Sequence, residues 1–190
     1  MEPQDIVKAQ LMTEDDLNRT LDRMARQIVD VLDVRPDTAS NFGVIGMQTR
    51  GVYLARRLCD RILAVEGIHV ESGVLDATMY RDDFRMRMKQ PVVRSTDIPF
   101  DVSGRHIVLV DDVLYTGRTV RAALDALMDM GRPASVTLLV VVDRGLHELP
   151  VQADIVGRHV PTIEGEEVRV RLSEIDELNG VWLVNNPKAA

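Results

Sequence analysis

The feature that most constrains the fold of this chain is a pair of apolar runs separated by a helical segment. The runs are His106–Val110 and Ser135–Val142, and apolar side chains occupy almost every position in both. Such runs are typical of strands that are covered on both faces. The intervening segment Thr119–Met130 has the apolar spacing of a helix, which Gly131 and Pro133 end. This order predicts parallel strands joined by a right-handed crossover.

Apolar residues recur with the same two periods in the segments that precede this unit. Residues 13–33 carry apolar side chains every three or four positions, which indicates an amphipathic helix with Thr13 as its N-cap. In chain order, the pattern then predicts a buried strand at Phe42–Met47, a helix at Val52–Val65 that Gly67 closes, and a second strand over about His69–Tyr80. Strands and helices therefore alternate well before the central unit.

The rest of the chain is less regular. Residues 81–101 are polar, charged and Pro-containing, which indicates a long loop or arm. Short strands are expected near Val168–Leu172 and Val181–Val184. The sequence has no repeat, low-complexity tract or Pro/Gly-rich linker, so we expect residues 1–190 to form a single α/β domain with a mostly parallel sheet flanked by helices.

Composition argues against several classes of function. The net charge of −7 opposes non-specific nucleic-acid binding, because such binding depends on neutralising phosphates. The single cysteine, Cys59, cannot form a disulfide within the chain, and we expect it to be a half-buried helix residue. The N-terminus has no basic region followed by an apolar run, and no apolar stretch reaches about 18 residues. We therefore expect a cytoplasmic protein with no membrane partner.

The chemistry is expected where the first apolar run ends. Asp111 and Asp112 follow that run, at the edge of a parallel sheet where ligands bind. Adjacent carboxylates repel each other there and lose hydration. A ribose diol or a nearby Mg²⁺ would compensate both costs. The small residues Thr116, Gly117 and Thr119 come next and lead into a helix, whose first N–H groups favour a phosphate. This order fits a sugar phosphate lying across the turn.

Two other kinds of site use a strand that ends in acidic residues or glycines. A P-loop NTPase would need a G-x-x-x-x-G-K-[ST] segment, and a dinucleotide-binding fold would need G-x-G-x-x-G after a strand. The chain contains neither motif, and Gly43 and Gly46 have the wrong spacing. A strand–turn–helix without a ligand is the third alternative.

The segment Val108–Thr119 resembles the phosphoribosyl pyrophosphate (PRPP) signature of the type I phosphoribosyltransferases. Further motifs resemble the PyrR family, whose members are pyrimidine operon attenuation regulators with uracil phosphoribosyltransferase activity. These motifs are Thr49-Arg50-Gly51, Tyr80-Arg81-Asp82-Asp83, Thr96-Asp97-Ile98-Pro99, Met130-Gly131-Arg132-Pro133, Val142-Asp143-Arg144-Gly145 and Glu148-Leu149-Pro150. The resemblance covers about residues 40–178 and implies the type I fold, with a small hood and a mobile arm.

The resemblance also implies a role for each motif, in a reaction that takes uracil and PRPP to UMP and diphosphate. Asp111 and Asp112 would hold the ribose hydroxyls and Mg²⁺. Arg50 and Arg81 would complete the catalytic set by stabilising the departing charge. The residues implied in binding PRPP or nucleotide are Thr49, Arg50, Gly51, Asp111, Asp112, Val113, Leu114, Tyr115, Thr116, Gly117, Arg118 and Thr119. Arg144 and the backbone near Val168 would cover the base.

Three functional classes stay open at this point. They are a uracil phosphoribosyltransferase with or without RNA regulation, an attenuator that only senses nucleotides, and a phosphoribosyltransferase for another base. Tyr115 favours a pyrimidine, since related purine enzymes carry an acid there. In the PyrR family a basic surface of the dimer binds RNA. The resemblance therefore implies that Arg19, Arg23 and Arg26 contact leader RNA. It also implies a homodimer or a dimer of dimers. His147 lies near the segment that would cover the base.

Overall fold

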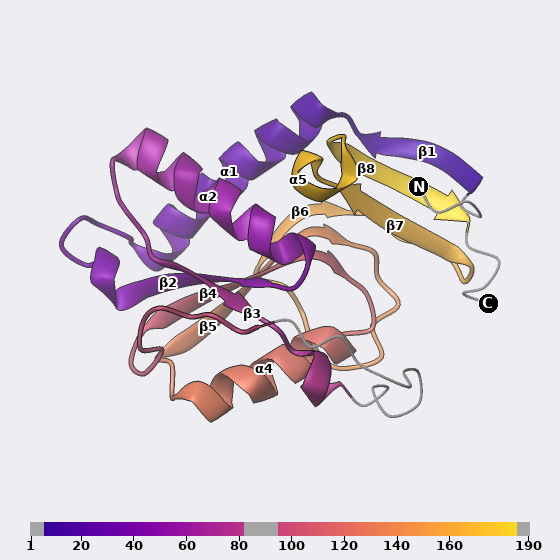
Figure 1. The fold of residues 1–190 in the computed structure, drawn as a ribbon. Coiled ribbons are helices and arrows are strands. Elements are labelled where there is room, and N and C mark those ends of the chain that lie inside the picture. Colours follow the sequence, from indigo (N-terminus) through magenta and orange to yellow (C-terminus); the bar gives the residue numbers. More distant parts are fainter. Residues whose placement is uncertain (1–5, 82–94, 186–190) are drawn as a thin grey trace.

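The computed structural model describes residues 6–81 and 95–185 of the 190-residue chain. These residues form one five-stranded sheet and one three-stranded sheet (Figure 1). The strands of the five-stranded main sheet, in spatial order, are β3 (Ser72–Leu75), β2 (Phe42–Met47), β4 (His106–Leu114), β5 (Ser135–Asp143) and β6 (Ile155–His159). All neighbouring strands in it are parallel, so the α/β class expected from the sequence is confirmed.

Helices cover both faces of the main sheet (Figure 1). The helices and single turns are α1 (Glu14–Leu32), η1 (Ala39–Asn41), α2 (Arg50–Glu66), η2 (Thr78–Tyr80) and α4 (Arg118–Met130). The side chains of β4 alternate between the faces: Val108 and Val110 join the core under α1 and α2, whereas Ile107 and Leu109 join the core under α4. Burial on both faces explains why the run is apolar at successive positions.

The three-stranded sheet and the short helix α5 (Ser173–Asp176) form a second layer, which we call the hood. Its strands, in spatial order, are β1 (Ile6–Met12), β8 (Gly180–Asn185) and β7 (Glu166–Arg171), and both pairings are antiparallel. The hood therefore joins the beginning and the end of the described chain, at one end of the main sheet (Figure 1).

The predicted helices are confirmed, with small shifts at their ends. Thr13 caps α1 reciprocally: its hydroxyl accepts a hydrogen bond from the N–H of Asp16 at 3.2 Å, and the Asp16 carboxylate accepts one from the N–H of Thr13 at 3.0 Å. Helix α2 begins at Arg50 rather than Val52, and Gly67 closes it in the left-handed conformation, with φ 67°.

The strand predicted over His69–Tyr80 is wrong at both ends, because β3 covers only Ser72–Leu75. After β3, the carboxylate of Asp76 accepts hydrogen bonds from the backbone N–H and the hydroxyl of Thr78, at 2.9 and 2.5 Å. This local turn competes with a sheet ladder and diverts the chain into η2. The β-branched and aromatic residues of this segment suggested a longer strand than the turn allows.

Strands β1 and β6 and helix α5 are not predicted by the sequence pattern. Most side chains of β1 are exposed, and of β6 only Ile155 is buried, so neither strand shows a strong apolar alternation. The predicted arm at residues 81–101 is described only in part, because residues 82–94 lie outside the described residues. Within the two described ranges, none of the helices has the length and apolar character needed to cross a membrane.

Candidate functional site

The site is built around Asp111 and Asp112, which lie within β4 rather than after it. Pairing of β4 with β2 ends at Val110, whereas pairing with β5 continues to Leu114. The strand predicted to stop at Val110 is therefore longer, and it is the β2 side that opens beside the acidic pair. Asp111 is only 8% exposed, and its carboxylate accepts a hydrogen bond from the N–H of Asp112 at 2.9 Å.

Burial changes the ionisation of this pair. It raises the pKa of Asp111 well above its ordinary value, and the charge of Asp112 adds to that rise. Burial also raises the pKa of Asp112, although its hydrogen bond with Asp111 and the charge of Arg50 oppose the rise. The described residues thus only partly compensate the ionised pair, and a cation or a set of hydroxyl donors would stabilise it.

The turn after β4 forms a cavity of about 210 Å³. Its lining includes Arg81, Asp111, Val113, Leu114, Tyr115, Thr116, Gly117, Thr119 and Val120. Gly117 is left-handed, with φ 85°, and α4 begins directly after it. The carbonyl of Thr116 accepts hydrogen bonds from the N–H groups of Glu148 and Leu149, at 3.0 and 3.1 Å, which holds the turn in place. The cavity therefore lies against the N-terminal N–H groups of a helix, the arrangement that binds phosphate.

Arg81 brings positive charge to this cavity. Its guanidinium donates a hydrogen bond to the hydroxyl of Thr119 at 2.9 Å, and its charge acts to lower the pKa of Asp111. Arg81 is thus placed between the acidic pair and the start of α4. The next part of the predicted arm, residues 82–94, falls outside the described residues, whereas residues 95–101 are described.

Two glycines bring the segment Thr49–Gly51 against β4. A Cβ on Gly51 would lie 2.3 Å from the carbonyl oxygen of Val110, and a Cβ on Gly46 would lie 2.4 Å from the carbonyl oxygen of Gly51. Only glycine permits backbones this close. The peptide bond between Gln48 and Thr49 is cis. The start of α2 consequently lies beside the acidic pair.

Arg50, the first residue of α2, is tied to the hood. Its Nε and Nη2 donate hydrogen bonds to the two carboxylate oxygens of Asp176, at 3.1 and 2.7 Å. Its charge also acts to lower the pKa of Asp112. The structure thus brings Arg50, Arg81 and the acidic pair to one region, as the sequence predicts. It also adds Asp176, a residue that lies in the irregular C-terminal part of the chain and in no motif.

Arg144 joins the hood to the turn. Its guanidinium carbon lies 4.0 Å from the centre of the Tyr115 ring, and its Nε donates to the hydroxyl of Thr162 at 3.0 Å. Its Nη2 donates to the backbone carbonyl of Glu166 in β7. Val168 is also buried in β7, at 7% exposure. Arg144 therefore has a structural task that the sequence does not reveal, and its contact with a base stays a prediction.

Two further side chains can now be placed. The Nε2 of His147 lies 2.9 Å from a carboxylate oxygen of Asp143, and that oxygen also accepts the N–H of Gly145 at 2.9 Å. His147 thus helps to hold the segment that follows β5. Cys59 is half-buried in α2, as predicted. Burial, with a smaller contribution from Asp60, raises the pKa of Cys59 to about 12, so the thiol is a poor nucleophile.

Arg19, Arg23 and Arg26 lie along one side of α1, next to two shallow hollows of about 380 and 450 Å³. Arg19 pairs with Asp16 at 2.6 Å, and Arg23 donates to the carbonyl of Gly157 at 2.7 Å. The larger hollow is lined by Arg19, Asp22, Arg23, Arg26, Gln27 and Asp30. The three arginines share a surface, and acidic residues interrupt it.

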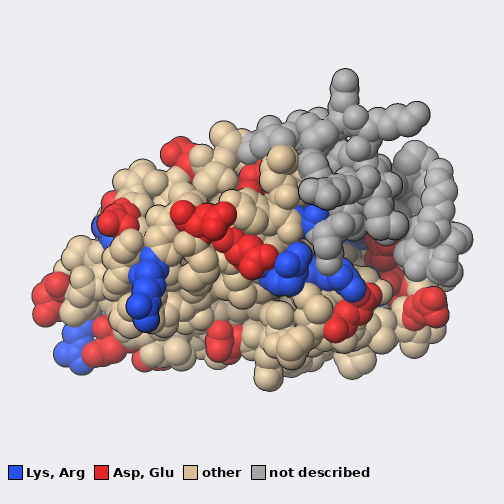
Figure 2. Space-filling view, turned by 90° about the horizontal axis from the view of Figure 1, so that it is seen from below, with Lys and Arg blue, Asp and Glu red and all other residues tan. Residues whose placement is uncertain are grey.

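Charges of both signs also mix on the face that α4 covers (Figure 2). Arg121 pairs there with Asp125 at 3.0 Å, and Arg118 pairs with Glu148 at 2.6 Å. Among the described residues of that face, basic and acidic side chains are therefore interspersed, in agreement with the net charge of −7.

Comparison with known proteins places these features in a family context. Residues 11–174 match the family model described as the phosphoribosyl transferase domain. The bifunctional protein PyrR of Pelotomaculum thermopropionicum is 54% identical over 169 residues, which cover 89% of this chain and 91% of that protein. The bifunctional protein PyrR of Deinococcus radiodurans is 49% identical over 169 residues, covering 89% and 90%.

Solved structures resemble the chain at lower identity. A hypoxanthine phosphoribosyltransferase from Trypanosoma cruzi has a TM-score of 0.73 and 19% identity, covering 96% of this chain and 97% of that one. One from Staphylococcus aureus has a TM-score of 0.67 and 16% identity, covering 97% and 96%. At these identities the likeness establishes a common fold and nothing about the base.

Proposed function

Because the chain belongs to the PyrR branch of the phosphoribosyltransferase family, we propose that it converts uracil and PRPP to UMP and diphosphate. The observation that carries this proposal is the convergence of the Asp111–Asp112 pair, the turn before α4 and two arginines on one region. Acidic groups, backbone amides and cations are the three partners that a sugar diol, its phosphate ester and a departing diphosphate require.

This placement supports the following course for the reaction. The carboxylates of Asp111 and Asp112 accept hydrogen bonds from the ribose hydroxyls, and the amides of Tyr115–Thr119 bind the 5-phosphate. The bond between the anomeric carbon and diphosphate breaks, and its electron pair leaves with the diphosphate. A uracil ring nitrogen supplies the pair for the new bond and loses its proton to diphosphate or solvent. Arg50 and Arg81 stabilise the charge that develops on the leaving group.

Mg²⁺ fits the carboxylates as a cofactor that is shared with the substrate. Asp111 is buried and Asp112 is half-buried, and the loss of hydration raises both pKa values, so a cation would stabilise the ionised pair. Among residues 6–81 and 95–185, no cluster of three or more acidic, His or Cys side chains could hold a metal ion alone. Asp111 and Asp112 would therefore hold Mg²⁺ together with PRPP oxygens, where it would offset the charge of the diphosphate.

The base would lie between the turn and the hood. Tyr115 is 41% exposed beside buried Arg144, and Val168 faces inward from β7. The aromatic ring at position 115 stands where the related purine enzymes carry an acid, which favours a pyrimidine.

Diphosphate release from PRPP with a panel of bases tests this proposal. We expect release with uracil and little with hypoxanthine or guanine. A preference for either purine over uracil would refute the assignment, even if turnover itself is fast. Omitting Mg²⁺ should abolish release, and restoring it should recover the rate.

A second function proposed for the chain is UMP-dependent binding of pyrimidine leader RNA, which would attenuate transcription. The alignment of Arg19, Arg23 and Arg26 on one side of α1 supports it. The acidic neighbours of these arginines keep the affinity for RNA in general low. Binding of UMP would then be needed to raise the affinity for the leader RNA. An enzyme without RNA regulation is the competing outcome.

Filter binding to the leader RNA, with and without UMP, tests this second function at moderate salt. Changing Arg19, Arg23 and Arg26 together to Gln should weaken binding and reduce the salt slope by about one for each phosphate that is no longer neutralised. Arg35→Gln is the matched control, because Arg35 is exposed beyond the end of α1 and pairs with Asp33. Binding that UMP leaves unchanged would refute the regulatory role.

We also propose that the chain acts as a homodimer or a dimer of dimers. Light scattering of the purified protein tests this proposal against the 21.3 kDa mass of a single chain. A mass of one chain at micromolar concentration would contradict it.

A further inference from the structure

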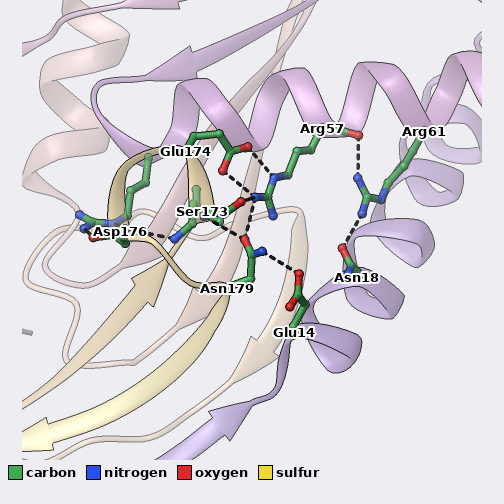
Figure 3. Close-up of polar contacts among 10 residues, drawn as sticks. Glu14, Asn18, Arg57, Arg61, Ser173, Glu174, Asp176 and Asn179 are labelled. Carbon is green, nitrogen blue, oxygen red and sulfur yellow. Dashed lines mark hydrogen bonds and ion pairs between the residues drawn. The ribbon is translucent and has the colours of Figure 1, made fainter.

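Residues 173–179, which begin with α5 of the hood and which we call the α5 turn, contact the helices α1 and α2 (Figure 3). The guanidinium of Arg57 in α2 donates to the carboxylate of Glu174 at 2.8 and 2.6 Å and to the side-chain oxygen of Asn179 at 2.7 Å. Asn179 in turn donates to the carboxylate of Glu14, in the first turn of α1, at 2.7 Å. These contacts hold the turn at a fixed position against α1 and α2.

Asp176 lies in this turn, and its contacts lead into the site. Its side chain is 7% exposed. One carboxylate oxygen accepts hydrogen bonds from Nη2 of Arg50 and from Nη1 of Arg171, both at 2.7 Å. The other accepts from Nε of Arg50 and from the N–H of Leu172, both at 3.1 Å. A bidentate pair of this kind fixes both the position and the plane of a guanidinium.

The local charges favour an ionised Asp176. Its burial acts to raise the pKa of the carboxyl group, but hydrogen bonds from Arg50 and Arg171 outweigh it and hold the pKa below its ordinary value. A single carboxylate thus faces two guanidinium groups, so the cluster keeps a net positive charge. The positive charge of Arg50 is close enough to Asp112 to oppose the rise in the pKa of that carboxyl group, so the cluster borders the acidic pair.

The pairing occupies one edge of the Arg50 guanidinium. Nε and Nη2 point toward Asp176, so Nη1 lies on the opposite side of the group. The side chain of Arg50 is 28% exposed, which leaves it accessible to a ligand. An arginine that is held along one edge can present its other edge to an anion without first losing side-chain freedom.

We propose that Asp176 is a positioning residue that orients Arg50 toward the diphosphate of PRPP. This inference rests on the proposed function, because it takes Arg50 as a contact of the leaving group. Asp176 acts through Arg50 and does not touch the substrate. The well-anchored turn gives Asp176 a fixed place, and the hood thereby sets the geometry at the start of α2.

Asp176→Asn tests the proposal, because it keeps the shape of the side chain and removes its charge. Calorimetry with diphosphate and with UMP gives the discriminating readout, since UMP lacks the diphosphate group. We expect diphosphate to bind about tenfold more weakly, on the scale of a charge-assisted contact, and UMP to bind as in the parent protein. In turnover, kcat should fall more than KM for PRPP rises, because Arg50 acts on the charge that develops on the leaving group.

Glu174→Gln is the matched control within the same turn. It removes the charge that pairs with Arg57 rather than with Arg50. Arg57 keeps Ser173 and Asn179 as acceptors, so the α5 turn stays anchored and diphosphate binding should be unchanged. A double-mutant cycle completes the design: in an Arg50→Lys background, Asp176→Asn should have little further effect on diphosphate binding. Asp176→Glu should recover part of the lost affinity, and it serves if the Asn variant fails to fold.

Three results would overturn the proposal. The first is an equal loss of affinity for diphosphate and for UMP in Asp176→Asn. The second is a loss of diphosphate affinity in Glu174→Gln as large as in Asp176→Asn. The third is that the effects of Arg50→Lys and Asp176→Asn on diphosphate binding add up. A parent protein that does not bind diphosphate would overturn it as well. Failure of the proposed function looks different: diphosphate binds and Asp176 matters, yet uracil releases no diphosphate from PRPP.

Discussion

The main sheet and the hood place their carboxylates in opposite situations. In the main sheet, burial and mutual repulsion raise the pKa values of Asp111 and Asp112. In the hood, hydrogen bonds from arginines overcome burial and lower the pKa values of Glu174 and Asp176. A carboxylate with few hydrogen-bond or charge partners is suited to bind a ligand. A carboxylate whose oxygens are fully hydrogen-bonded within the protein is suited to a structural role. We therefore infer that the main sheet supplies the binding groups and that the hood positions them.

The largest expected effect separates catalysis from stability in the main sheet. Changing Asp111 and Asp112 together to Asn should lower turnover of uracil and PRPP on the order of 10³-fold or more, because the ribose and Mg²⁺ lose their anionic partners. Folding should not suffer, because the change removes one buried and one half-buried charge that lack full compensation. Steady-state rates and urea unfolding of the same variant check both halves.

The opposite combination would break the comparison between the regions. If the Asn pair kept most of its turnover but lost several kcal/mol of stability, the acidic residues would be structural. Asp176→Asn is the reference variant for this experiment. The carboxylate of Asp176 accepts four hydrogen bonds, so its loss should lower stability, unlike the loss of the acidic pair.

The next effect tests how closely the main sheet is packed behind the site. Gly51→Ala should destabilise the protein by about 3 kcal/mol, because its Cβ would lie 2.3 Å from the carbonyl oxygen of Val110. Gly67→Ala is the matched control: its Cβ would meet nothing within 4 Å, so only the left-handed backbone, at a cost of about 1 kcal/mol, opposes it. Chemical denaturation of the two variants measures the difference, and equal losses would contradict the close packing.

The two regions also differ in what the sequence reveals. The strand His106–Leu114 and its neighbours are predictable, because burial on both faces forces apolar residues at successive positions. The strand β1 is not predictable, because its side chains are mostly exposed and its partner lies at the other end of the chain, where Ile6 pairs with Asn185. Periodicity records burial, and it records little about pairing between distant segments.

The same distinction applies to the site residues. Asp111, Gly117 and Thr119 follow one another along the chain, so their common chemistry is visible in a short motif. Asp176 meets Arg50 across 126 positions, and no local pattern announces that contact. The motif of Arg144 suggested a contact with the base, whereas its hydrogen bonds with Thr162 and Glu166 appear only in three dimensions.

The junction between the regions should give a smaller effect on stability. Arg144→Met should destabilise the protein by about 2 kcal/mol, because the hydroxyl of Thr162 and the carbonyl of Glu166 lose a charged donor. The loss stays moderate because burial disfavours the charge on Arg144 itself, lowering its pKa. Thermal or urea unfolding measures this loss. A variant as stable as the parent would show that the hood does not depend on this junction.

The smallest expected effect concerns the pH dependence of the hood. The pKa of Asp176 is lowered in the folded protein, against the effect of its burial, by Arg50 of α2 and Arg171 of β7. The folded state thus binds the proton less readily than the unfolded chain, whose aspartate pKa is about 3.9. The stabilisation is complete above that pH and disappears as the pH falls through the lower folded value. The parent should be more stable than Asp176→Asn by about 1 kcal/mol at pH 6, and this gap should shrink as the pH falls below the unfolded pKa of about 3.9. Urea midpoints across the range measure the gap, and a gap that grew on acidification would mean that the carboxylate does not stabilise the hood through its charge.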